Sequence, residues 1–296
     1  MSNSNNSSTV LVAGATGFLG GEICRQLIAK NKNVRALVRV TSDPNKVALL
    51  KELGVEIVEG DLKDSSSLEN ALHGVSAIIS TVSSTFSRQE GDSIKTVDDE
   101  GQNNLINAAV HADINQFIYI SFCAMPDQFP LQTAKRKVEK HLVESGLNYT
   151  ILQPTFFMES WLSPALGFDY PNATATIYGE GKNKISWIAI KDVASFAVAS
   201  LDNPAAKNIS MELGGLAAIS PLEVVNIFEA NHGKHFKLQF VPEEALRAQK
   251  DAAQDPLSES FAALMLSFAL GSEINMKNLL DVFPIELTTV NDYAKM

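Results

Sequence analysis

The chain has 296 residues, with 34 acidic side chains and 24 lysines and arginines, so that 24 − 34 gives a formal charge of −10. Hydrophobic residues make up 45% and charged residues 20%, as in an ordinary globular protein, which excludes a disordered, collagen-like or coiled-coil chain. The acidic balance argues against nucleic acid and anionic membrane surfaces as direct partners, because no basic excess is present to displace counterions.

The ends and the cysteines favour a cytoplasmic protein. Residues 1–8 are polar and lack the basic and apolar parts of a secretory signal. The longest apolar run, 261–270, is far shorter than the ~20 residues that cross a bilayer. The two cysteines, Cys24 and Cys123, lie in segments of buried character, so no disulfide framework is expected.

Strand and helix patterns alternate through the first half of the chain. Strands are predicted at 10–13, 33–38, 55–59, 77–80, 117–121 and 149–152. Helices are predicted at 18–30, from Asp43-Pro44 to Gly54, and at 65–72, 93–112 and 132–145. This alternation implies right-handed crossovers and a doubly wound parallel sheet of the Rossmann type over residues 1–155.

After Pro154 the alternation breaks down. A strand at 185–190, helices at 193–201 and 222–230, and a largely helical stretch at 243–270 are predicted. We therefore expect a smaller α/β substrate or lid domain over 156–296, with parts of 185–215 returning to the first domain.

A glycine-rich turn, Gly14-Ala-Thr-Gly17-Phe-Leu-Gly20, joins the first strand to the first helix. Gly14 permits a tight exit from the strand, Gly17 a close approach to a pyrophosphate, and Gly20 close packing of helix on strand. The N–H groups of the helix N-terminus then face the anion. Because the turn follows the first strand and precedes the first helix, a dinucleotide site is favoured over a turn that binds no ligand. The predicted contacts are Gly14, Thr16, Gly17, Phe18, Leu19 and Gly20.

The residue after the second strand indicates which dinucleotide binds. NAD sites place an acid about twenty residues after the turn. Here Arg39 occupies that place, and no acid follows until Asp43. A guanidinium suits the 2′-phosphate of NADP, so NADP is favoured over NAD. The alternative is a solvated cation at a strand end.

Further candidates follow the other strands, because ligands bind at the carboxyl edge of an open parallel sheet. Asp61 would accept from the adenine amino group while Leu62 packs on the ring, although Asp61 is equally a turn former. The remaining candidates at strand ends are Ser80, Thr81, Ser121, Pro154 and Phe156 for the cofactor, and Phe157 and Met158 for the substrate.

Lys135 is the candidate catalytic residue. It lies about 60° from Val138 and about 20° from Leu142 around the helix axis, on the apolar face. A lysine there, near the helix N-terminus, is expected to point toward the cofactor cleft. The alternative is an aliphatic stem that covers the core.

Metal and nucleophilic chemistry are not indicated. His232 and His235 lie three residues apart, but no cysteine or carboxylate pattern accompanies them. The sequence also lacks a Gly-x-Ser-x-Gly motif and a Cys-His pair. No metal site is predicted.

Several segments together resemble the NmrA-like and isoflavone-reductase-like branch of the atypical short-chain dehydrogenases. They are VLVAGATGFLGGEICRQL, VRALVR, VEGDLKD, QFIYIS, AKRKVEKHLVESGLNYTILQPTFFMES, IAIKDVA and FPIELTTVNDYA. The resemblance implies an NADP-preferring domain and a small substrate domain. It matches Gly14, Gly17, Gly20 and Arg39 to cofactor residues, and Lys135 to the lysine that reductase members use near the nicotinamide.

One position departs from the superfamily. The tyrosine that serves as proton donor four residues before the lysine is replaced by Leu131. This argues against alcohol oxidation and leaves two hypotheses. The first is an NADPH-dependent reductase of a small conjugated acceptor such as a quinone or enone. The second is an NAD(P)-binding redox-sensing regulator without turnover, acting on a protein partner, and a scaffold or assembly factor is a further alternative.

Overall fold

The computed structural model describes residues 9–86 and 89–296 and divides into two compact units. Unit 1 contains the described residues up to Ser121, together with Ala134–Leu152 and Ala194–Met211. Unit 2 contains Phe122–Thr133, Gln153–Val193 and Glu212–Met296. The units are interleaved in sequence, so that single helices and strands run from one unit into the other.

Unit 1 is built on a seven-stranded sheet with the order β3-β2-β1-β4-β5-β6-β9. The strands are β1 (Thr9–Ala13), β2 (Asn33–Val38), β3 (Glu56–Glu59), β4 (Val75–Ser80), β5 (Gln116–Ile120), β6 (Tyr149–Pro154) and β9 (Ile209–Leu213). The pairings from β3 through β6 are all parallel, with Ala13 opposite Leu37 on one side and Ser80 on the other. The predicted doubly wound sheet is confirmed.

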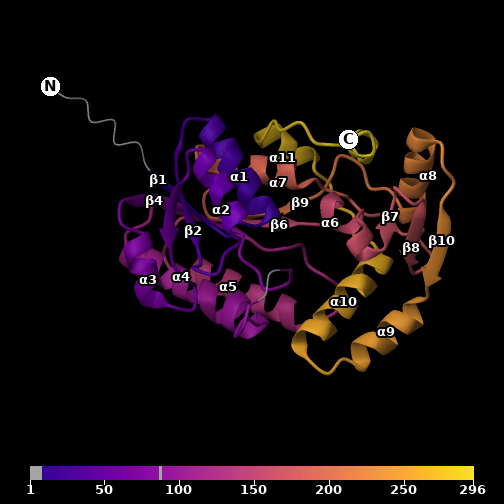
Figure 1. Ribbon diagram of the computed structural model, residues 1–296, viewed down its shortest axis with the longest axis horizontal. Coiled ribbons are helices and arrows are strands. Elements are labelled where there is room, and N and C mark those ends of the chain that lie inside the picture. The colour runs from indigo at the N-terminus through magenta and orange to yellow at the C-terminus, as the bar shows by residue number, and fades with distance from the viewer. Residues whose placement is uncertain (1–8, 87–88) are drawn as a thin grey trace. The chain divides into compact units, whose positions relative to one another are not determined.

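Helices cover both faces of this sheet. They are α1 (Phe18–Ala29), α2 (Pro44–Glu52), α3 (Ser65–Ala71), the π-helix η1 (Ile94–Asp99), α4 (Glu100–His111), α5 (Pro130–Glu144), α7 (Ile190–Ser200) and the 3₁₀ turn η3 (Pro204–Ala206). Figure 1 shows α1, α2 and α7 along one side of the sheet and α3, α4 and α5 along the other.

Local sequence explains where these helices begin and what they bury. Asp43 accepts a hydrogen bond from the Asn45 N–H and Pro44 fills the first turn of α2. On the buried face of α5, Val138 and Leu142 pack in the same core cluster as Phe117 and Tyr119 of β5. Burial of these apolar side chains is the main force that holds α5 to the sheet.

The helix predicted at 93–112 is in fact two. It opens as η1, with a reciprocal capping box between Ser93 and Thr96, and continues as α4 from Glu100. The wider π turn inserts a residue into the helical repeat. Ile94, Val97 and Asp98, at the spacing i, i+3 and i+4, are buried together. Asp98 therefore lies in the interior of unit 1.

Unit 2 contains a small mixed sheet with the order β10-β8-β7. Its strands are β7 (Phe168–Asp169), β8 (Thr174–Tyr178) and β10 (Lys237–Val241). Its helices are α6 (Met158–Trp161), the 3₁₀ turn η2 (Pro164–Leu166), α8 (Pro221–His232), α9 (Glu243–Asp251), α10 (Pro256–Leu270), α11 (Lys277–Val282) and α12 (Val290–Tyr293). Among the described residues, no helix has the length and apolar character needed to cross a membrane.

The strand predicted at 185–190 is wrong. Residues 185–189 make only isolated bridges, such as Ile185 with Ile219 and Ile188 with Phe157. The segment is nevertheless buried, because Trp187 packs edge-on against Phe268 in an aromatic cluster. The apolar character of the segment therefore reflects its burial and not a strand.

Candidate functional site

The order of strands in unit 1 reverses between β1 and β4, which is where open α/β sheets bind ligands. Gly14 leaves β1 with φ of 83°, and a Cβ there would lie 2.5 Å from Thr81 Oγ1 at the end of β4. A Cβ on Gly20 would lie 2.2 Å from the Gly14 carbonyl oxygen. Both positions require glycine, one for its backbone conformation and both for the close approach.

Helix α1 presents an uncapped N-terminus at this turn. Among the described residues no side chain caps it, and its first turn carries no acidic residue. Helix α3, by contrast, is capped by Asp64, α8 by Ser220 and α10 by Asp255. The N–H groups at the start of a 12-residue helix are thus left to an external anion.

A pocket of about 130 Å³ opens beside this turn. Seven of the predicted cofactor residues line it: Gly14, Thr16, Gly17, Arg39, Asp61, Leu62 and Thr81. Seven further residues complete the lining: Leu37, Ser42, Gly60, Val82, Ser83, Asp92 and Val97. Most of these residues follow the ends of β1, β2, β3 and β4, whereas Asp92 precedes η1 and Val97 lies within it.

Arg39 does not stand as an isolated cation. Its Nη1 lies 2.6 Å from Asp92 Oδ2, and Lys63 Nζ lies 2.6 Å from Asp92 Oδ1. The Asp92 side chain is 1% exposed. Burial acts to raise the pKa of Asp92, but hydrogen bonds from Arg39 and Lys63 outweigh it and hold this pKa below its ordinary value. Sequence reasoning missed Lys63 and Asp92, since nothing in the sequence links Asp92 to a residue 53 positions away.

The other predicted residues of the turn and of β3 and β4 differ in what their side chains do. Phe18 is exposed, and Lys46 Nζ lies over its ring, 5.8 Å from the centroid. Leu19 is half-buried. Asp61 accepts from the Lys63 N–H at 2.9 Å. The buried Ser80 hydroxyl donates to Gln102 Oε1 at 2.9 Å, so it is engaged within the core.

Lys135 lies on α5, and its side chain is buried against the end of β5. It is 5% exposed, and its Nζ lies 3.3 Å from the Ile120 carbonyl oxygen and 3.5 Å from Tyr119 Oη, both long hydrogen bonds. Nζ also lies 5.1 Å from the Tyr119 ring centroid. Burial lowers the pKa of Lys135, while the carboxylates of Asp98 and Glu139 act in the opposite direction.

Two buried polar atoms of unit 1 near the same strand ends lack a hydrogen-bond partner among the described residues. They are Ser121 Oγ, directly after β5, and Asp98 Oδ1. The other Asp98 oxygen accepts from the Ser84 N–H at 3.0 Å and its hydroxyl at 2.6 Å. Buried polar groups are rarely left unpaired, so these two atoms are candidates for a hydrogen bond to an ordered water or to a bound polar ligand. Sequence reasoning found Ser121 but missed Asp98, which is buried within η1.

The predicted residues of unit 2 are mostly packed. Pro154 and Met158 are buried, and Phe156 is 3% exposed and lies edge-to-face with Trp161 and Phe268. Only Phe157, half-buried before α6, keeps part of its surface exposed.

Leu131, at the position of the absent tyrosine, is also buried. Its N–H donates to Ser260 Oγ at 3.1 Å. The side chain thus has a packing role and offers no group for proton transfer.

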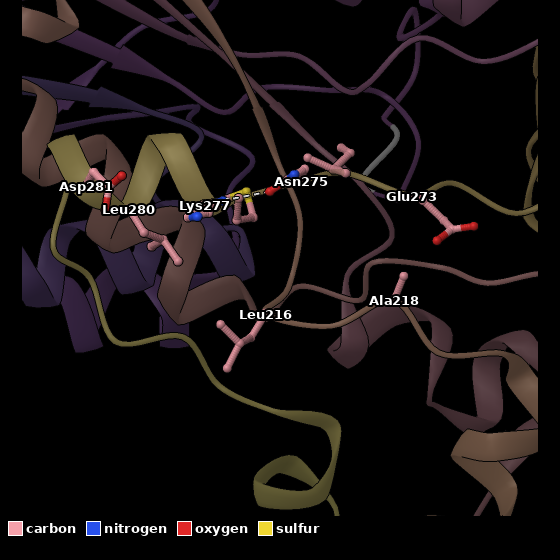
Figure 2. Close-up of a pocket in the computed structure, with 9 residues that line it drawn as sticks. Leu216, Ala218, Glu273, Asn275, Lys277, Leu280 and Asp281 are labelled. Carbon is pink, nitrogen blue, oxygen red and sulfur yellow. Dashed lines mark hydrogen bonds between the residues drawn. The ribbon is translucent and has the colours of Figure 1, made fainter.

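Unit 2 contains a second pocket, of about 590 Å³, drawn in Figure 2. It is lined by Leu216, Ala218, Glu273, Ile274, Asn275, Met276, Lys277, Leu280 and Asp281. Charged and aliphatic side chains alternate around it, and none of the predicted site residues belongs to it. Among the described residues, no group of three or more histidine, cysteine or acidic side chains is placed to hold a metal.

The fold and the glycine turn together define a doubly wound α/β protein of the Rossmann type. The model of the NmrA-like family matches residues 6–294, and the chain belongs to this family. The resemblance identified in the sequence is thereby confirmed.

Relatives in this family differ in what they do. The photosystem II assembly factor Ycf39 of Synechocystis is 32% identical over 80% of this chain and 72% of its own length. An NAD(P)H azoreductase of Xenophilus azovorans is 29% identical over 93% of this chain and 91% of its own. The NADPH complex of the quinone oxidoreductase QOR2 of Escherichia coli has the same fold, with a TM-score of 0.77 and 24% identity over 96% of this chain and 98% of its own.

Proposed function

We propose that this protein is an NADPH-dependent reductase. The observation that carries the proposal is the pocket in unit 1, where the uncapped N-terminus of α1, the Gly14 turn and Arg39 meet at the switch point of the sheet. The NAD(P)H azoreductase, 29% identical over most of both chains, supports the same assignment.

The residues present fit a dinucleotide phosphate. The turn holds Gly14 and Gly17 where backbone must approach a pyrophosphate closely, and the free N–H groups of α1 supply donors. Asp61 and Leu62 would contact the adenine, and Arg39 would pair with the 2′-phosphate. Asp43 forms the cap of α2 and is thus engaged, which favours NADP over NAD.

Lys135 and Ser121 would serve the reacting end of the cofactor. When bound, NADPH supplies a hydride to an acceptor. The ammonium of Lys135, held against the Ile120 carbonyl and the Tyr119 hydroxyl, would orient the nicotinamide ribose or stabilise negative charge developing on the acceptor. The unpaired hydroxyl of Ser121 offers a further hydrogen bond at the same strand end.

The acceptor we propose is a small conjugated molecule such as a quinone or enone. Leu131 replaces the usual phenol, so the acceptor must tolerate protonation by solvent or by the lysine. The exposed part of Phe157 offers an apolar contact for a flat ring. The fold neighbour that is a quinone oxidoreductase supports this acceptor class.

A second candidate function is a redox-sensing regulator or assembly factor that binds NAD(P) without turnover. Two observations favour it. Leu131 removes the standard proton donor, and relatives at 32% and 31% identity are photosystem II assembly factors. In that case the small-molecule acceptor is replaced by a protein partner.

Calorimetric titration with NADPH and NADH, followed by an acceptor screen, separates the two. The reductase predicts tighter binding of NADPH than of NADH and NADPH oxidation with at least one quinone or enone. Binding without oxidation across the panel would support the regulator and overturn the reductase.

Lys135→Met tests the residue that we place in the reaction. It should leave NADPH affinity within about threefold and reduce turnover at least about tenfold, because orientation of the nicotinamide and stabilisation of developing charge act mainly on the transition state. The matched control is Lys140→Met, which removes an exposed ammonium from the same helix. Equal turnover in the two variants would remove Lys135 from the mechanism.

A further inference from the structure

The anion already present beside Arg39 is the carboxylate of Asp92. It contacts Arg39 Nη1 and Lys63 Nζ at 2.6 Å each, and its Oδ2 also accepts from the Gln89 N–H at 3.0 Å. Its side chain is 1% exposed, whereas Arg39 and Lys63 are 24% and 29% exposed. Two half-buried cations therefore converge on one buried carboxylate at the wall of the pocket.

The backbone holds Asp92 firmly in this place. The Asp92 N–H donates to the Gln89 carbonyl oxygen at 2.9 Å, which closes a tight turn. Gln89 Nε2 then donates to the Thr41 carbonyl oxygen at 3.0 Å, so this turn is fastened to the loop that follows β2. Asp92 is thus built into the pocket and is unlike a surface ion pair, whose geometry is loose.

We propose that Asp92 is an internal counter-anion that competes with the 2′-phosphate of NADP for Arg39 and Lys63, and so weakens the preference for NADP over NAD. The inference rests on the proposed role of Arg39 in holding that phosphate. Lys63, which lies in the VEGDLKD segment but was given no role there, then becomes a second cation of the phosphate subsite.

The physical reason is the charge balance. Arg39 and Lys63 are faced by Asp92 and also by Asp61, whose Oδ2 lies 3.8 Å from Lys63 Nζ, so the two cations and two carboxylates carry no net charge. A phosphate that pairs with Arg39 must either displace the Asp92 carboxylate or share Arg39 and Lys63 with it. In a half-buried site the negative charges of the phosphate and of Asp92 then repel each other strongly. NADH lacks this phosphate, so its binding is insensitive to the charge of Asp92.

Asp92→Asn tests the proposal, because it removes the charge and keeps the shape. Binding of 2′,5′-ADP, NADPH and NADH is measured by calorimetry on the full chain. We expect about tenfold tighter binding of 2′,5′-ADP and NADPH, with NADH changed less than about twofold. The matched control is Asp202→Asn, which breaks the 2.8 Å ion pair with Lys32 in the same unit and should change none of the three.

An unchanged or lower ratio of NADPH to NADH affinity in Asp92→Asn overturns the proposal. A selective loss of NADH affinity does so as well, since it would make Asp92 an acceptor for the ribose hydroxyls. Asp92→Ser repeats the measurement in a second variant, so that a folding defect of one substitution cannot decide the result.

Lys63→Gln and Arg39→Gln distinguish this inference from the proposed function. Lys63→Gln should weaken 2′,5′-ADP and NADPH about tenfold and leave NADH unchanged, and no effect would overturn the role of Lys63. If Arg39→Gln leaves the NADPH to NADH ratio unchanged, the proposed NADP subsite itself fails. If only the Asp92 variants fail to respond, the subsite stands and the counter-anion is refuted.

Discussion

Gly20 and Gly21 are adjacent in α1 but differ sharply in what a methyl group would meet. At Gly20 the added Cβ would lie 2.2 Å from the Gly14 carbonyl oxygen and 2.7 Å from its carbon. At Gly21 the nearest atom would be the Ala15 carbonyl oxygen at 3.4 Å, an ordinary contact. Both residues lie inside the helix and neither has a positive φ, so backbone conformation does not distinguish the two positions.

We predict opposite effects of Gly20→Ala and Gly21→Ala on stability. Each substitution gains about 1 kcal/mol of helix propensity. At Gly20 the added Cβ would lie 2.2 Å from the backbone oxygen of Gly14, which is about 1.2 Å closer than an ordinary contact of 3.4 Å. The clash is with rigid backbone. Overpacking of that kind costs about 3 kcal/mol or more, so the net loss is about 2 kcal/mol. At Gly21 the propensity gain should appear almost undiminished.

Thermal unfolding of the two variants measures this difference. Gly20→Ala should lower Tm by about 4–8 °C, and Gly21→Ala should raise it by about 2–4 °C. Because α1 must move away from the turn, Gly20→Ala should also weaken NADPH binding, whereas Gly21→Ala should not. Equal melting temperatures for the two would refute the argument that helix and turn need this close approach.

Three further substitutions or reactions test other parts of the structure. Asp98→Asn should lower the pKa of Lys135 further, because it removes a carboxylate that favours the ammonium. A ¹⁵N NMR titration of the lysine Nζ measures this pKa, and an upward shift would contradict the prediction. Asp192 is 2% exposed and accepts from the Thr288 N–H and hydroxyl at 2.8 and 2.9 Å, so Asp192→Ala should cost about 2–4 kcal/mol in urea unfolding. Burial raises the pKa of Asp192 above its unfolded value, hence stability should fall as pH rises through the folded pKa, and Asp192→Asn should lack this slope. Burial raises the pKa of Cys24 to about 12, so a thiol reagent at pH 8 should modify it only as fast as the protein unfolds.

The first half of the fold could be predicted because its elements follow from local chemistry. The cap by Asp43, the proline at the start of α2 and the apolar repeat of α1 place helix boundaries within a few residues of the observed ones. Glycine at 14, 17 and 20 marks the turn, and the geometry requires a missing side chain at Gly14 and Gly20. The short strands β9 and β10 were not predicted, although residues 209–213 and 237–240 alternate between apolar and polar side chains. Both strands form by pairing with partners that are distant in the sequence.

The helix predicted at 93–112 shows where local patterns fail. Its apolar spacing fits an α-helix and does not indicate that the first turn, which Ser93 and Thr96 cap, is a π-helix. Nor does the spacing indicate that one oxygen of the buried Asp98 lacks a hydrogen-bond partner among the described residues.

The amino-acid composition excludes whole classes of protein but assigns no site. By itself the sequence determined the alternating elements, the glycine turn and the placement of Arg39 after β2, since these depend on neighbours a few residues apart. Only the tertiary structure brought Asp92 to Arg39 and Lys63, 53 and 29 positions away in the chain. Charge interactions act through space, and only folding fixes which charges meet.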